Sequence, residues 1–170
     1  MKKLFIVIAM GLPFLSLSQQ CIVKYCDDMT DKCTYYPNQN MILANDDKTT
    51  GFIVDARIVE KAGQLSVADI MVKSVNIGLC NEKDKLILML SDSTKLSLTS
   101  WNNFNCEGNA WFTLKESDVK RLASNKIIKA YFENGKSYES FTKEVTGEKQ
   151  DYFVKIIADC KENKFTLLSK

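Results

Sequence analysis

The 170-residue chain contains no histidine. This absence excludes Ser-His and Cys-His catalytic pairs and every metal site that needs an imidazole ligand. With only seven glycines, the chain also lacks the Gly-rich phosphate loops and the Gly-x-Ser-x-Gly nucleophile motif. General acid–base chemistry would fall to carboxylates, lysine, tyrosine or cysteine. We therefore expect a protein that is not an enzyme and that carries no cofactor or metal.

Long apolar runs are scarce as well. The longest stretch, residues 4–17, has 14 residues, fewer than the roughly 20 that a membrane-spanning helix needs. Two lysines precede it and small residues follow at Ser16 and Ser18, which is the layout of a secretory signal peptide. We expect cleavage after Ser18, leaving residues 19–170 as a single globular domain. The alternatives are an uncleaved anchor and a lipid on Cys21, although Gln20 stands where lipoprotein processing needs a small residue.

The mature chain has no excess of charge of either sign. Removal of Lys2 and Lys3 lowers the 23 basic residues to 21, which equals the 21 acidic residues. Nonspecific nucleic-acid binding and docking on anionic membranes both need an excess of basic charge. We therefore expect no nucleic-acid partner and no membrane insertion after signal cleavage. Secretion or a periplasmic location follows from the signal peptide.

Most of the chain shows strand patterns. Residues 52–60 alternate, with Phe52, Val54, Ala56 and Ile58 on one face, and residues 67–77 form a second β-rich run. Residues 86–90 are apolar on both faces, as in an interior strand, and residues 95–99 alternate. We predict a hairpin between these two segments, turning at Asp92-Ser93, with Leu90 opposite Lys95 and with Met89 and Ile87 meeting Leu96 and Leu98.

A second hairpin is predicted at Asn134-Gly135. This dipeptide separates residues 127–133 from 136–142 and is typical of a two-residue type I′ turn. That turn places Glu133 opposite Lys136, Tyr131 opposite Tyr138 and Ile128 opposite Phe141. Residues 151–158 are read as a last strand.

One short helix is expected between the strands. Thr113 and Glu116 have the spacing of a capping box, Val119, Leu122 and Ala123 form one apolar stripe, and Asn125 offers a left-handed stop. The predicted fold is mainly β, an antiparallel two-layer β-sandwich with one short helix. The alternative is an α+β fold, in which a helix covers one face of an antiparallel sheet.

Six cysteines follow the cleavage site, an even number that indicates disulfides in an exported chain. Cys80 and Cys106 flank the first predicted hairpin, which brings its two ends together, so we expect them to pair. The close pair Cys26 and Cys33 can staple each other, which would leave Cys21 to join Cys160, although other pairings of these four stay open. A zinc site at Cys21, Cys26 and Cys33 is disfavoured, because only one tight pair exists and histidine is missing.

Two acidic clusters could bind a hard cation such as Ca²⁺. Asp27, Asp28 and Asp31 form one, and Asn45, Asp46 and Asp47 form the other. The second fails the EF-hand pattern because Lys48 occupies a ligand position. Such clusters in loops are usually solvated turns, and we favour that interpretation.

The segment 101–112 holds both tryptophans, two phenylalanines and four asparagines. Aromatic faces beside amide groups suit the recognition of sugars or peptides, which makes Trp101, Asn103, Phe104 and Trp111 the candidate binding residues. The alternative places Trp111 and Phe112 in a core strand and uses the asparagines for turns. Tryptophan is highly buried on average, which favours this alternative. A recognition role requires Trp101 and Phe104 to be exposed and Trp111 to support them from behind.

Three functional hypotheses follow. The first is a non-enzymatic binding or interaction module of the bacterial periplasm or exterior, with an unknown protein or glycan as its partner. The second is an inhibitor or immunity-type protein that blocks a partner enzyme. The third is a carboxylate-dependent hydrolase, which needs two acids converging in one pocket.

Overall fold

The computed structural model describes residues 21–161 apart from residues 28, 38, 62 and 63. The predicted signal peptide, residues 1–18, lies outside the described residues. The side chains of Cys21 and Cys160 do as well, and so does their proposed pairing.

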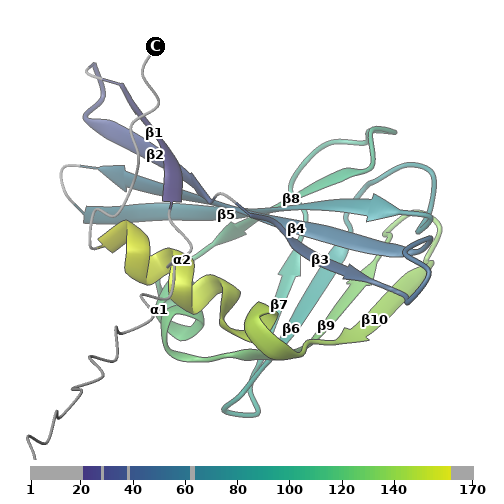
Figure 1. The fold of residues 1–170 in the computed structure, drawn as a ribbon. Helices are drawn as coiled ribbons and strands as arrows, with labels where there is room; N and C mark the ends of the chain where they lie inside the picture. Colours follow the sequence, from purple (N-terminus) through teal and green to yellow (C-terminus); the bar gives the residue numbers. More distant parts are fainter. Residues whose placement is uncertain (1–20, 28, 38, 62–63, 162–170) are drawn as a thin grey trace, which may run out of the picture.

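The fold consists of two antiparallel sheets and two short helices, as the sandwich prediction requires (Figure 1). The large sheet has the order β1-β2-β4-β5-β8, with β3 beside β4. Its strands are β1 (Cys21–Asp27), β2 (Lys32–Pro37), β3 (Met41–Ala44), β4 (Gly51–Lys61), β5 (Gln64–Val75) and β8 (Asn109–Leu114). The small sheet has the order β10-β9-β6-β7. Its strands are β6 (Lys85–Leu90), β7 (Lys95–Thr99), β9 (Ile127–Glu133) and β10 (Ser140–Glu144).

The large sheet is covered in two halves. Figure 1 shows the small sheet beneath one half and the helices α1 (Glu116–Ser124) and α2 (Tyr152–Lys161) beneath the other. A short 3₁₀ turn, η1 (Gly147–Asp151), leads into α2. The helices contact each other, and α1 lies against β5 while α2 lies against β4. The fold is therefore a sandwich at one end and a sheet covered by helices at the other.

The core lies between these layers, and the alternation in β4 explains how it forms. Phe52, Val54, Ala56 and Ile58 are all buried on the inner face, as predicted. Leu86, Leu88 and Leu90 of β6 are fully buried from the other side. The Phe52 ring lies 5.6 Å from that of Phe132 in β9, so the two sheets meet through aromatic side chains.

The first hairpin forms where it was predicted, but its register is one residue away. Met89, not Leu90, lies opposite Lys95. As a result Leu88 and Leu86 meet Leu96 and Leu98, whereas the predicted register assigned these contacts to Met89 and Ile87. Because a shift of one residue exchanges the two faces of a strand, burial of the leucines selects the observed register.

The second hairpin has a longer turn than Asn134-Gly135 predicted. Glu133 lies opposite Ser140 and Phe132 opposite Phe141, so residues 134–139 form the loop. The two-residue turn is therefore wrong, and so are the predicted partners of Glu133, Tyr131 and Ile128. The observed register places Phe141 beside Phe132, and the Phe141 ring lies 6.2 Å from that of Phe52.

The C-terminal segment is a helix, so the predicted strand at residues 151–158 is wrong. The buried apolar residues of this helix are Tyr152, Phe153, Ile156 and Ile157, and their spacing of one, three and one positions fits one face of a helix. An alternating strand would have buried every second residue.

The helix α1 has the predicted length and apolar stripe, but its ends differ from the prediction. Val119 and Leu122 are buried. Lys115 is the N-cap, and its backbone N–H donates to the Asp118 carboxylate, in place of the predicted Thr113–Glu116 pair. Asn125 ends the helix in an extended conformation, not a left-handed one.

Candidate functional site

Four large apolar side chains are exposed on three loops at one end of the sandwich. The loops are residues 76–84, 100–108 and 134–139, at the right-hand side of Figure 1. We call the exposed set the loop platform, and its members are Leu79 (91% exposed), Tyr138 (76%), Trp101 (58%) and Phe104 (50%). Exposed apolar side chains gathered in this way are typical of an interaction surface.

A buried polar cluster holds these loops together from below. Asn81, Asp84, Ser100 and Asn134 are all buried. The Asn134 Nδ2 atom donates to the Cys80 carbonyl at 2.8 Å, and the Gly135 N–H donates to Asp84 Oδ1 at 2.9 Å. The Asp84 N–H donates to Ser100 Oγ at 2.8 Å. Each loop is thus bonded to another through groups that water does not reach.

The disulfide Cys80–Cys106 adds a covalent link between two of the loops. It is the pairing expected from the flanking hairpin. Beside it, Asn81 and Asn105 exchange two backbone hydrogen bonds of 2.7 and 3.1 Å. The second disulfide, Cys26–Cys33, joins β1 to β2 far from the platform.

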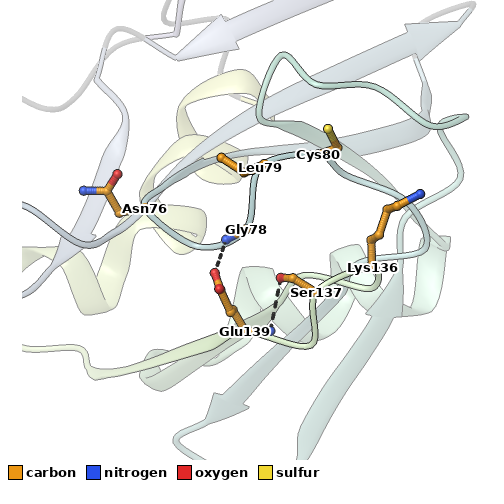
Figure 2. A pocket seen from close by; sticks show the side chains of 7 residues that line it. All are labelled: Asn76, Gly78, Leu79, Cys80, Lys136, Ser137 and Glu139. Atoms are coloured by element: carbon orange, nitrogen blue, oxygen red, sulfur yellow. Dashed lines mark hydrogen bonds between the residues drawn. The ribbon is translucent and has the colours of Figure 1, made fainter.

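A hollow of about 550 Å³ lies within the platform (Figure 2). Leu79 and Cys80 lie on one wall, and Ser137 and Glu139 lie on the other. Gly78 has φ +71°, and a side chain there would meet that of Asn134, so glycine is required.

The charged groups at the hollow both have partners. The Glu139 carboxylate accepts a hydrogen bond from the Gly78 N–H. The Lys136 ammonium lies 4.5 Å from the centre of the Phe104 ring, in a cation–π contact. Tyr138 adopts φ +62°, a left-handed conformation that is unusual for a bulky residue and that places its ring in solvent.

The four candidate residues of segment 101–112 are placed differently. Trp101, Asn103 and Phe104 are exposed on the loop. Trp111 is half-buried on the outer face of β8, with its ring centre 6.5 Å from that of Trp101. Trp111 therefore supports Trp101 from behind and is not part of the core, whereas its neighbour Phe112 is.

The other asparagines of this segment build the loop. Asn102 Oδ1 accepts a hydrogen bond from the Trp111 N–H at 2.8 Å, and Asn105 Nδ2 donates to the Asn109 carbonyl at 3.0 Å. Glu107 N–H donates to Asn105 Oδ1. The amides of Asn102 and Asn105 are thus used within the loop, whereas Asn103 is exposed.

Sequence reasoning missed Leu79 and Tyr138. Leu79 follows buried Ile77 in an apolar run, and nothing in that run shows that the chain turns it outward. Tyr138 was assigned to a strand on the basis of Asn134-Gly135. A dense group of loop-forming residues at 76–81, 102–109 and 134–137 was the available signal.

The acidic clusters serve as turns where the structure describes them. Asp27 Oδ1 accepts a hydrogen bond from the Met29 N–H and Asp47 Oδ1 accepts one from the Thr49 N–H, both at 2.9 Å. Hydrogen bonds from Thr30 and Thr49, respectively, lower the pKa of these two carboxyls. Within the described residues, no three His, Cys, Asp or Glu side chains gather closely enough to hold a metal ion.

Three cavities among the described residues each contain a single carboxylate. Glu139 lies in the platform hollow, Glu133 in a hollow of about 360 Å³ on the outer face of the small sheet, and Asp55 in a notch on the large sheet. A hydrolase that uses two acids needs both in one pocket, and none of these three cavities of the described chain supplies that pair.

No family model matches this chain, and neither does any curated protein or solved structure. Along the described residues, no helix combines the length and the apolar character needed to cross a membrane. The class of protein that the fold defines is a disulfide-containing β-sandwich with a loop platform at one end.

Proposed function

We propose that this protein is a non-catalytic binding module that works in the periplasm or outside the cell. The observation that carries the proposal is the exposure of Trp101 and Phe104 on a loop pinned by Cys106. Leaving a large aromatic side chain in water forgoes about 2–3 kcal/mol of burial free energy, which a ligand can recover. Two disulfides among the described residues are compatible with an oxidising compartment.

A pinned loop also suits binding for an entropic reason. The disulfide, the Asn81–Asn105 bridge and the asparagine hydrogen bonds hold the loop in one shape. Binding then orders few groups, and more of the contact energy contributes to affinity. The loop that carries the exposed rings therefore has its conformation fixed before a partner binds.

The test is a Trp101→Ala variant, compared with a Tyr25→Ala variant whose exposed ring lies on the distant hairpin β1–β2. Both proteins, in their oxidised exported form, are screened on glycan and protein arrays. We expect Trp101→Ala to lose its ligand while its melting temperature shifts little, and Tyr25→Ala to keep the ligand. Loss of about 3 kcal/mol or more of stability in Trp101→Ala, the cost of a core tryptophan, would contradict the proposal.

The second candidate function is an inhibitor or immunity-type protein. Leu79, the most exposed member of the platform, lines the hollow, and an aliphatic side chain in that place favours a protein partner. A pull-down from envelope extract should then recover one stoichiometric partner, and Leu79→Lys should abolish its capture. Binding that depends on Trp101 but not on Leu79 would count against this function.

A further inference from the structure

The outer face of the small sheet carries a hollow that is separate from the loop platform. Its volume is about 360 Å³, within the range of about 300–1,000 Å³ that is usual for small-molecule sites. Alternate residues of β6 point away from the core, so Ile87 and Met89 lie on this face while the three leucines of the strand are buried on the other. Both side chains are half-buried and line the hollow.

The middle of the hollow is an apolar floor. The strand register places Ile87 of β6 opposite Tyr131 of β9, and Tyr131 lies opposite Thr142 of β10. Neighbouring strands lie about 5 Å apart, so Ile87 and the Tyr131 ring form one continuous surface. Such a floor suits the aliphatic or aromatic body of a ligand.

At one end of the floor the charges are balanced. Lys85 Nζ donates to Glu133 Oε1 at 2.8 Å, and the Tyr131 hydroxyl donates to Glu133 Oε2. The hydrogen bonds from Lys85 and Tyr131 lower the pKa of the Glu133 carboxyl. This end therefore presents a carboxylate whose charge and hydrogen-bonding capacity are already used.

At the other end two lysines flank Met89. Lys95 of β7 lies opposite Met89 on one side, and Lys129 of β9 lies opposite it on the other. Lys129 forms an ion pair of 2.7 Å with Glu144, but both side chains are exposed, and such pairs contribute little. Among the described residues, no carboxylate forms an ion pair with Lys95. This end of the hollow therefore has an excess of positive charge.

We infer that this hollow binds a small organic anion with an apolar body, of which a medium-chain carboxylate is the simplest example. The body lies over Ile87 and the Tyr131 ring. The carboxylate lies above Met89, where the ammonium groups of Lys95 and Lys129 donate to it. Charge complementarity selects an anion, because two lysines face one carboxylate at that end. The volume of the hollow suits a small molecule.

The test titrates the oxidised exported protein with octanoate, octanol and octylammonium, with calorimetry and the NMR shifts of backbone amides as readouts. We expect octanoate to bind about two-fold to ten-fold more tightly than octanol, the worth of an exposed ion pair, and octylammonium to bind most weakly. The shifted amides should lie in β6, β7 and β9. Equal affinity for the three compounds, no binding of octanoate, or shifts confined to other strands would overturn the inference.

Two substitutions should act in opposite directions. Lys95→Gln removes the unpaired charge and should weaken octanoate binding by about two-fold to ten-fold, while octanol binding stays the same. Glu144→Gln releases Lys129 from its ion pair and should strengthen octanoate binding by about two-fold. Lys73→Gln, at an exposed position of β5 in the large sheet, is the matched control and should bind as the parent does. Equal effects of Lys95→Gln and Lys73→Gln would contradict the assigned site.

The outcomes also separate this inference from the proposed function of the loop platform. Octanoate binding that falls in Lys95→Gln and survives in Trp101→Ala supports a second site. Octanoate binding that is lost in Trp101→Ala and kept in Lys95→Gln overturns the inference, because the ligand then lies on the platform. A tetraglutamate peptide has no apolar body, and if it binds as tightly as octanoate, the face recognises acidic chains and the inference is overturned.

Discussion

Asn134 connects two loops of the platform through one buried side chain. Its Oδ1 accepts hydrogen bonds from the N–H groups of Lys136 and Ser137, and its Nδ2 donates to the Cys80 carbonyl. We expect Asn134→Ala to lower the free energy of unfolding by about 2–4 kcal/mol, because buried groups on both loops lose their partner. Urea denaturation measures this change. Asn40→Ala, at an exposed position, should change it by less than about 0.5 kcal/mol, and equal losses in both variants would contradict the role of Asn134.

Asp55 should make stability depend on pH in an unusual direction. Burial raises its pKa above the ordinary value of 3.8, so the folded protein holds the proton more tightly than the unfolded chain does. Ionisation of Asp55 therefore costs stability as the pH rises above that value. We expect Asp55→Asn to raise the melting temperature at pH 7, and we expect this gain to disappear below about pH 3, where aspartate is mostly protonated in both states.

Asp92 provides the opposite case. The Thr94 hydroxyl lowers the pKa of Asp92, so its contribution is present at neutral pH and is lost as the pH falls. Asp92→Asn should lower the melting temperature at pH 7 and have less effect in acid. Melting curves of Asp55→Asn and Asp92→Asn at neutral and at acid pH check both predictions. The same sign for both variants would show that burial does not control Asp55.

At the scale of elements, α2 closes the half of the large sheet that the small sheet leaves open. Ile156 points into this core, whereas Val154 is half-buried at the flank. We expect Ile156→Ala to lower the free energy of unfolding by about 2–4 kcal/mol through loss of burial and a remaining cavity. Val154→Ala, which removes a smaller and less buried side chain, should cost clearly less in the same urea titration. Equal costs would indicate that α2 is not held by its inward face.

The helix α2 shows why the sequence alone misassigned an element. Between Tyr152 and Ile157, apolar residues occur both in alternation and at helical spacing, so periodicity fits a strand and a helix. The contacts that decide between them come from β4 and from α1, which are distant in sequence. Tertiary packing thus selects one of two structures that are equally compatible with the local pattern.

The hairpins show that the local sequence does not fix the strand register either. Asn134-Gly135 is a strong turn signal, but the two-residue turn would have placed Phe132 opposite Ser137 and Phe141 opposite Ile128, whereas Phe141 lies opposite Phe132. Packing of the partly buried Phe141 against Phe52 outweighs the turn preference, and Asn134 instead closes a longer loop with its side chain. The inner face of β4 and the Cys80–Cys106 pair could be predicted, because these depend on local alternation and on hairpin return. The exposure of Leu79 could not, because it depends on how three loops meet.

At the scale of the whole molecule, β6 and β7 form an insertion between two neighbouring strands of the large sheet. The chain leaves the large sheet after β5, makes the hairpin in the small sheet and returns as β8, which pairs with β5. Cys80 lies on the outgoing connection and Cys106 on the returning one. The disulfide therefore closes the base of the insertion.

Removing this disulfide should cost more than removing the other one. The Cys80–Cys106 bridge spans 26 positions and the Cys26–Cys33 bridge spans seven. On the chain-entropy account, the longer loop contributes about 3–4 kcal/mol and the shorter one about 1 kcal/mol less. Denaturant titrations of the Cys80→Ser/Cys106→Ser and Cys26→Ser/Cys33→Ser double variants should follow this order. The reverse order would show that strain or residual structure in the unfolded chain dominates.

The inserted hairpin also has a consequence while the chain is being synthesised. Synthesis proceeds from the N-terminus, so β6 and β7 exist before β9, the strand that must pair with the other edge of β6. Until β9 arrives, the leucine-rich β6 has an open edge that could pair with a neighbouring nascent chain. Once oxidised, the Cys80–Cys106 bridge holds the two ends of the β6–β7 hairpin together. Among the described strands, β9 is the one that pairs with this edge, so its arrival ends the exposure of β6 to neighbouring chains.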